Sequence, residues 1–171
     1  MNLNKAVTES FLTELSEKAV KNLKLQNKTL SLAESCTGGL VSKFITDVSG
    51  ASAVYEGGVC SYSNKVKMNM LGVNKNTLES FGAVSEQTAR EMAEGVRKTV
   101  GADIGIGITG IAGPKSDGTN KPVGLIYVAI CDGNKTHITE LKNNFTENIR
   151  MCNRYKATEA ALNLLVEYNE E

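Results

Sequence analysis

The segment Leu30-Ser31-Leu32-Ala33-Glu34-Ser35-Cys36-Thr37-Gly38-Gly39-Leu40 organises the chain. It opens as an alternating apolar run, which is typical of a β-strand, and this strand is expected to end at Ser35. Apolar residues then recur with helical period up to residue 48, Gly50 supplies a stop signal, and Thr37 is the expected N-cap. The segment therefore predicts a strand, a turn that carries a hydroxyl group, and a helix.

Such a turn suits chemistry on an anion or on an acyl group. Gly38 and Gly39 leave the first amide groups of the helix uncovered by side chains, and both these amides and the helix dipole favour negative charge. The position also suits a nucleophile. A second interpretation, an ordinary turn between strand and helix in an α/β protein, stands beside this one because short turn patterns are common.

Composition bounds the class of protein. A chain of 171 residues with 41% hydrophobic residues fits one domain, assigned to residues 1–171, with a helix within residues 1–27 packed on it. The formal net charge is zero and no basic run stands out, so a nucleic-acid partner is not expected. The first residues lack an apolar signal region and no apolar run is long enough to span a membrane, which predicts a cytoplasmic protein.

The cysteines and the single histidine give no metal-site pattern. Cys36, Cys60, Cys131 and Cys152 are scattered without a C-x-x-C pair, and neither zinc nor disulfides are expected. Cys36 lies beside a predicted helix start, which favours a reactive thiolate. Its partner would have to be His137, which lies in a polar strand, so a Cys/His couple is the less favoured interpretation.

Lys67 lies near the start of a predicted short helix. Ser63 is the expected N-cap of a helix over residues 64–71, which Gly72 ends. The positive end of the helix dipole and partial burial would both lower the pKa of Lys67 toward that of a general base. Taken alone, the residues favour a solvated surface lysine, like the neighbouring Lys65.

The glycine-rich segment 102–111 is predicted to be a strand. Gly105-x-Gly107-x-x-Gly110 matches the dinucleotide-binding fingerprint, but the first two glycines lie inside the strand and no helix follows, so this interpretation is rejected. Glycine on alternate positions instead lets another element pack closely. The polar loop over residues 113–122 joins two strands and is expected to lie at a sheet edge as a lid over a pocket.

The remaining segments predict helices and a hairpin. Thr8 caps a helix with an apolar stripe made of Val7, Phe11, Leu15, Ala19 and Leu23. Asp132-Gly133 marks a hairpin before a polar edge strand. Ser85 is the expected cap of a longer helix, and Thr146 is the expected cap of the last helix. That helix carries Arg150, for which an anionic partner is expected, and Arg154, which is interpreted as a surface charge. The predicted order α-β-α-β-α-α-α-β-β-β-α indicates a mixed sheet between helical layers.

Together these segments resemble the CinA C-terminal domain family, whose best-known members are nicotinamide mononucleotide (NMN) deamidases. The matching pieces follow the family order from about residue 10 to residue 168. Each is weak alone and the set is highly specific: Ala33-Glu34-Ser35-Cys36-Thr37-Gly38-Gly39, Ser49-Gly50-Ala51-Ser52, Tyr62-Ser63-Asn64, Lys67, Leu71-Gly72-Val73, Gly82-Ala83-Val84-Ser85-Glu86, Thr109-Gly110-Ile111-Ala112-Gly113-Pro114 and Lys121-Pro122-Val123-Gly124.

The resemblance implies a fold and a reaction. The fold is a three-layer α/β/α domain with a mixed, mostly parallel sheet, commonly assembled as a homodimer. The reaction is hydrolysis of NMN to nicotinic acid mononucleotide and ammonia in pyridine nucleotide salvage, without a metal or another cofactor. By residue match, the site of the family falls on Ser35, Ser52, Tyr62, Lys67, Thr109 and Arg150.

A Ser/Lys arrangement suits amide hydrolysis, because a neutral lysine takes the serine proton and then returns a proton to the leaving ammonia. Either Ser52 or Ser35 is the nucleophile. We favour Ser52 paired with Lys67, with Ser35 and Tyr62 in orienting roles. The amides of the glycine turn hold either the nucleotide phosphate or the oxyanion. The expected substrate-binding residues are Thr37, Gly38, Gly39, Thr109, Gly110 and Arg150.

Departures from the family pattern surround the expected pocket. Ala51 stands beside Ser52 where the family has a second serine, Val54-Tyr55 and Gly57 replace two aromatics and an arginine, and Lys115 replaces an acidic residue. The usual Gly-Asp-Arg reads Asn148-Ile149-Arg150. An alternative is therefore a non-catalytic nucleotide-binding or regulatory protein associated with competence or DNA damage, for which the neutral net charge argues against direct DNA binding.

Overall fold

The computed structural model describes residues 7–169, so the expectation about the first residues of the chain lies outside the described part. The elements follow the predicted order. They are α1 (Glu9–Leu25), β1 (Leu30–Glu34), α2 (Leu40–Thr46), the short 3-10 helix η1 (Ala51–Ala53), β2 (Tyr55–Cys60), α3 (Asn64–Leu71), α4 (Lys75–Phe81), α5 (Glu86–Val100), β3 (Ile104–Gly110), β4 (Leu125–Cys131), β5 (Thr136–Lys142) and α6 (Ile149–Glu167).

The strands form one mixed sheet in the order β2-β1-β3-β4-β5. Strand β1 pairs in parallel with both β2 and β3, whereas β4 is antiparallel to β3 and β5 is antiparallel to β4. The sheet is thus mixed, as predicted, with its parallel and antiparallel pairs in equal number rather than mostly parallel. The three parallel strands end at the same edge, which is where ligand sites of α/β sheets form.

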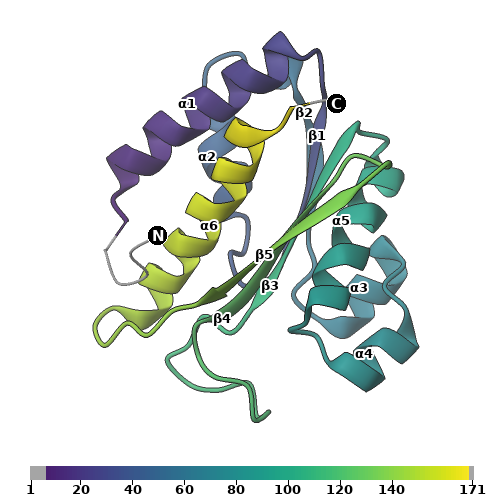
Figure 1. Cartoon of the computed structure of the whole chain (residues 1–171), viewed down its shortest axis with the longest axis vertical. Helices are drawn as coiled ribbons and strands as arrows, with labels where there is room; N and C mark the ends of the chain where they lie inside the picture. The colour runs from purple at the N-terminus through teal and green to yellow at the C-terminus, as the bar shows by residue number, and fades with distance from the viewer. Residues whose placement is uncertain (1–6, 170–171) are drawn as a thin grey trace.

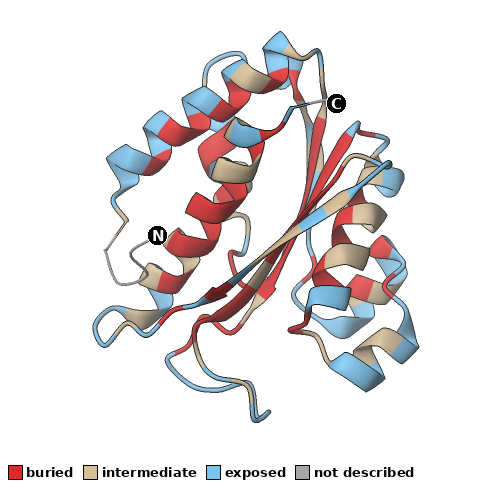
Figure 2. Cartoon of the chain, in the orientation of Figure 1, coloured by how far each residue is buried: buried red, intermediate tan, exposed pale blue. Residues whose placement is uncertain are grey.

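Two helical layers cover the sheet, which confirms the predicted α/β/α architecture (Figure 1). Helices α1, α2 and α6 pack together on one face, and α3, α4 and α5 lie on the other. The central strands β3 and β4 are buried on both faces. The edge strand β5 instead consists mostly of exposed and half-buried residues (Figure 2). The α1 helix packs on α6.

Close packing of α5 on β3 explains the glycines of that strand. A Cβ atom on Gly105 would lie 2.1 Å from the carbonyl oxygen of Ala93, and one on Gly107 would lie 2.3 Å from that of Ala89. These separations are far below contact distance, so only glycine lets the helix backbone approach the strand this closely. The prediction that another element packs closely on this face is confirmed.

The helix caps confirm most local predictions and correct two of them. The side chains of Thr8, Ser63 and Ser85 each accept an amide hydrogen bond at a helix start, as predicted. Thr37 is not a cap, because α2 begins only at Leu40 and follows a left-handed Gly39. Thr146 is not a cap either, because a left-handed Asn148 precedes α6. In both cases the chain turns once more before the helix starts, which a capping pattern does not reveal.

The buried stripe of α1 contains the predicted Leu15, Ala19 and Leu23 but not the predicted Phe11. Phe11 is 42% exposed, and Leu12, Leu15, Ala19, Val20 and Leu23 face the core. The spacing of four residues that gave the prediction drifts around a helix with 3.6 residues per turn. The stripe therefore follows the alternating three- and four-residue spacing of an amphipathic helix.

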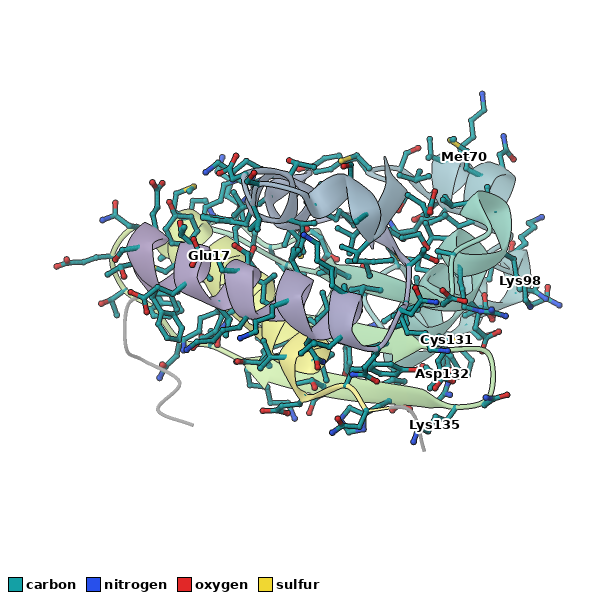
Figure 3. The ribbon with its side chains drawn as sticks, turned by 90° about the horizontal axis from the view of Figure 1, so that it is seen from above. Glu17, Met70, Lys98, Cys131, Asp132 and Lys135 are labelled. Carbon is teal, nitrogen blue, oxygen red and sulfur yellow. The ribbon has the colours of Figure 1, made fainter. Side chains whose placement is uncertain are left out.

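The predicted hairpin connects β4 and β5. The Asp132 carboxylate accepts hydrogen bonds from the amides of Asn134 and Lys135, both at 2.9 Å, which close the turn. Figure 3 shows Cys131, Asp132 and Lys135 together at this end of the sheet.

Among the described residues, no helix combines the length and the apolar character that crossing a membrane requires.

Candidate active site

Three parallel strands deliver polar residues to one edge of the sheet. The last residue of β1, Glu34, is in register with Cys60 of β2 and with Ile108 of β3. The residues that follow, Ser35, Ser61 and Thr109, therefore emerge side by side. Strand pairing thus brings together segments that lie far apart in the sequence, at the edge where α/β proteins commonly bind ligands.

Lys67 reaches this edge from α3 and contacts Ser35. Its Nζ atom lies 3.0 Å from the Oγ atom of Ser35 and 2.5 Å from the carbonyl oxygen of Ser61. Capping by Ser63 starts α3 at Asn64 and puts Lys67 in the first turn, so the helix holds the side chain in a fixed direction. The structure thus brings Ser35 and Lys67 within hydrogen-bond distance.

Burial sets the charge state of Lys67. The residue is 1% exposed, and desolvation lowers its pKa from 10.5 to about 8. This value makes the neutral amine accessible near physiological pH, which general-base catalysis requires. The surface-lysine interpretation is therefore wrong for Lys67, whereas Lys65 on the same helix is exposed.

The amides at the start of α2 already have an internal partner. One Glu34 carboxylate oxygen accepts from the amides of Gly39 and Val41, both at 3.1 Å. The other oxygen accepts from the amide of Ser42 at 2.9 Å and from its hydroxyl at 2.7 Å. The expectation that the Thr37-Gly38-Gly39 turn holds a ligand anion through these amides is therefore wrong for Gly39, because a buried carboxylate occupies that position.

Thr37 and Gly38 also differ from their predicted role. The Gly38 amide donates to the carbonyl oxygen of Ser35, and the Thr37 hydroxyl is buried without a hydrogen-bond partner among the described residues. Arg154 donates to the Thr37 carbonyl oxygen from Nε at 3.2 Å and from Nη2 at 2.7 Å. Arg154 is thus a half-buried clamp on this turn rather than the surface charge that was expected.

Cys36 is not set up as a nucleophile. The residue is 6% exposed, and burial raises the pKa of its thiol to about 12. His137 lies on the edge strand β5 and lines other hollows, so the Cys/His interpretation has no geometric support. Within residues 7–169, no three His, Cys, Asp or Glu side chains gather as a metal-ligand set.

A pocket of about 210 Å³ opens over the Ser35–Lys67 pair. Its lining contains five of the six residues matched to the family site: Ser35, Tyr62, Lys67, Thr109 and Arg150. Gly110 also lines it, and Asp117 reaches it from the predicted lid loop.

The rim of the pocket combines an aromatic ring and a cation. Arg150 donates from Nη1 to the carbonyl oxygen of Gly113 at 3.0 Å and from Nη2 to the Tyr62 hydroxyl at 3.1 Å. Tyr62 is 68% exposed, so its ring is accessible beside the pocket. Thr109 is 1% exposed and donates to the carbonyl oxygen of Ala83 at 2.7 Å, which fixes its side chain at the pocket wall.

Ser52 does not join this group. It is exposed on η1 and lines a separate hollow with Thr46, Ser49 and Tyr55. The favoured pairing of Ser52 with Lys67 therefore does not match the geometry of this chain, in which Ser35 occupies the partner position. The sequence analysis missed two further residues, Asp117 and Glu34. Asp117 lies in a polar loop, and nothing in the sequence indicated that this loop approaches the pocket. Glu34 could have been found, because it is an acidic residue shortly before a helix start.

Comparison with known proteins gives this geometry a family context. The model of the CinA C-terminal domain family matches residues 12–169. The chain belongs to this family. It is 49% identical to a CinA-like protein of Syntrophomonas wolfei over 138 residues, which cover 81% of this chain and 32% of that protein. It is 45% identical to a CinA-like protein of a Thermotoga species over 151 residues, which cover 88% of this chain and 36% of that protein.

Solved structures of the family share the fold. The competence/damage inducible protein CihA from Agrobacterium tumefaciens is 35% identical, superimposes with a TM-score of 0.87, and matches over 95% of this chain and 98% of its own. The chain spans about a third of the length of the curated relatives it matches, and nearly all of this solved structure.

Proposed function

We propose that this protein hydrolyses the carboxamide group of NMN, yielding nicotinic acid mononucleotide and ammonia. The observation that carries the proposal is the contact between the Nζ atom of Lys67 and the Oγ atom of Ser35 inside a pocket. Hydrolysis of an unactivated amide needs a nucleophile, a base to activate it and an acid for the leaving group, and a Ser/Lys pair supplies all three.

In the proposed first half-reaction, the neutral amine of Lys67 takes the proton of Ser35 as its Oγ attacks the carboxamide carbon. The lowered pKa of Lys67 supports this assignment. The carbonyl oxygen becomes an oxyanion, which we assign to the amide of Cys36, a group that follows the nucleophile and that Glu34 does not bind. Collapse breaks the C–N bond, and the Lys67 ammonium gives its proton to the leaving ammonia.

In the second half-reaction, water attacks the acyl ester on Ser35. Neutral Lys67 takes a proton from this water, and the resulting ammonium returns it to Ser35 as the ester bond breaks. The carboxylate product then leaves. The Ser61 carbonyl oxygen accepts a second hydrogen bond from Lys67, which supports a fixed position of the amine through both steps.

The family resemblance and the rim of the pocket support a pyridine nucleotide as substrate. The Tyr62 ring is exposed at the pocket, where it suits stacking with the pyridine ring. Arg150 presents a guanidinium group at the same rim, and this group binds phosphate well. The resemblance also supports a single-domain protein that is cytoplasmic and forms a homodimer. Light scattering of the purified protein tests the dimer.

Ammonia release from NMN by the purified protein tests the proposal. We expect turnover by the wild type and a loss of at least about 1,000-fold in Lys67→Met, because both half-reactions use this amine. Lys65→Met on the same helix is the matched control and should retain wild-type turnover. Calorimetric binding of NMN without ammonia release would support the alternative, a nucleotide-binding regulatory protein.

A further inference from the structure

Glu34 is linked by hydrogen bonds to the segments that hold both Ser35 and Lys67. Its side chain holds the turn that follows Ser35, through the four hydrogen bonds to Gly39, Val41 and Ser42. Its carbonyl oxygen accepts the amide of Ser61 at 2.8 Å, and the Ser61 carbonyl in turn accepts Lys67. One buried residue therefore links the nucleophile turn to the anchor of the base.

The hydrogen-bond chain continues outward from Glu34. The Tyr55 hydroxyl donates to the Ser42 hydroxyl at 2.8 Å, and that hydroxyl donates to Glu34 at 2.7 Å. Burial raises the pKa of Tyr55, so its hydroxyl keeps the proton that this chain requires. Both hydroxyl groups thus point their hydrogens toward the carboxylate.

We propose that Glu34 is a positioning residue that sets the Ser35–Lys67 geometry, a role that rests on the proposed amide hydrolysis. Its carboxylate substitutes for a ligand anion at the start of α2 and locks the turn between β1 and that helix. The nucleotide phosphate must then bind elsewhere, and Arg150 at the pocket rim is the cation placed to receive it.

The chemistry of the carboxylate makes this role specific. Each oxygen accepts two hydrogen bonds, and all four donors converge on the side chain. A glutamine would turn an NH₂ group toward two of these donors and lose their bonds, because its nitrogen accepts none. The turn would then relax, and a displacement of about 1 Å at a reacting group costs on the order of 100-fold in rate.

The test compares wild type and Glu34→Gln by reaction with a fluorophosphonate probe. The Ser35 Oγ forms a bond to phosphorus, the P–F bond breaks, fluoride leaves and Lys67 takes the proton. We expect the rate constant of labelling to fall on the order of 100-fold in Glu34→Gln. The final extent of labelling per total protein should be unchanged, because a positioning defect slows each molecule, whereas misfolding removes molecules from the reactive pool.

Glu159→Gln is the matched control. Glu159 is a buried carboxylate, 9% exposed, and binds Lys156 on α6 at 2.6 Å, outside the pocket lining. Its substitution should lower the unfolding temperature and leave the labelling rate constant within about twofold of wild type. Where Glu34→Gln does not fold, Ser42→Ala tests the same network, because it removes one of the four bonds and should slow labelling by about three- to tenfold. Labelling of Ser42→Ala within about twofold of wild type would then overturn the positioning role.

Separate outcomes decide the two proposals. Labelling of Glu34→Gln at the wild-type rate would overturn the positioning role, as would an equal slowing in Glu159→Gln. Slow labelling of Glu34→Gln together with no ammonia release from NMN by wild type would leave the positioning role in place and reject NMN as substrate. A wild-type protein whose Ser35 the probe does not label would overturn Ser35 as the activated nucleophile and, with it, the positioning role of Glu34, whereas ammonia release from NMN decides the reaction separately.

Discussion

The Nζ atom of Lys67 lies 3.0 Å from the Oγ atom of Ser35, although 32 positions separate the two residues in the chain. Parallel pairing of β1 with β2 accounts for this contact, because Glu34 and Cys60 are in register and their successors emerge together. The following helix, α3, then returns Lys67 to the strand ends. The pair is thus a product of sheet topology, and its chemistry depends on the charge of the lysine.

The pH dependence of activity should follow the neutral form of Lys67. Burial lowers its pKa to about 8, and only the neutral amine accepts the serine proton. We expect kcat/KM for ammonia release to rise about tenfold per pH unit below pH 7 and to level off above about pH 9. A stopped assay in constant-ionic-strength buffers measures this profile. A flat profile between pH 6 and 9 would contradict general-base catalysis by this lysine.

Lys67 should also reduce the stability of the protein at neutral pH. At pH 7 it is charged in both the folded and unfolded states, and its burial opposes the charged form. The unfolded chain keeps its proton up to about pH 10.5 and the folded protein only to about 8, so folding becomes more favourable as pH rises between these values.

Lys67→Met removes this penalty. We expect a gain of roughly 1–3 kcal/mol in the free energy of unfolding at pH 7, and a smaller gain at pH 10. Urea unfolding at both pH values measures it. Lys65→Met, at an exposed position of α3, should change stability by less than about 0.5 kcal/mol at either pH. Equal effects of Lys67→Met at the two pH values would show that charge burial is not the cause.

Arg150 should contribute mainly to recognition of the phosphate. Arg150→Ala is expected to raise KM for NMN by about 10- to 100-fold, the usual value of a charged hydrogen bond, with a smaller change in kcat. Nicotinamide riboside lacks the phosphate, so kcat/KM for it should change much less. Tyr62→Phe, which removes only the hydroxyl that Arg150 contacts, separates loss of the rim contact from loss of the charge. An equal loss for both substrates would place the phosphate elsewhere.

Gly107 should be essential for packing of α5 on the sheet. A Cβ atom there would lie 2.3 Å from the Ala89 carbonyl oxygen and 2.6 Å from the Ala93 amide nitrogen, and both are backbone atoms that cannot rotate away. We expect Gly107→Ala to cost at least about 3 kcal/mol. Gly72→Ala, at a left-handed position with open space around it, should cost only about 1 kcal/mol. Similar losses in urea unfolding would argue against the close contact.

Local patterns were sufficient for much of the fold. Ser63 and Ser85 each stand before a helical apolar pattern, and Asp132-Gly133 stands between two strands, so these boundaries are encoded within a few residues. The glycines of β3 likewise indicated the close approach of another element, although the sequence did not identify α5 as that element. The start of α2 was misplaced because Glu34 supplies from the preceding strand the acceptors that a local cap would provide.

The candidate site depended more on tertiary structure. The residue match gave Lys67, Tyr62, Thr109 and Arg150, and the structure gathers them around one pocket. The residue match could not decide which of two serines lies beside Lys67, because the spacing of residues in the sequence does not give the distance between segments in the fold. The register of β1 and β2 helps to place Ser35, rather than Ser52, beside the lysine, and this contact is why we propose Ser35 as the nucleophile.

Paired serine variants test the central claim most directly, through kcat/KM for ammonia release from NMN. If Ser35 is the nucleophile activated by Lys67, Ser35→Ala should lose at least about 1,000-fold in kcat/KM, and Ser52→Ala should stay within about threefold of wild type. Full activity in Ser35→Ala together with a large loss in Ser52→Ala would contradict the account.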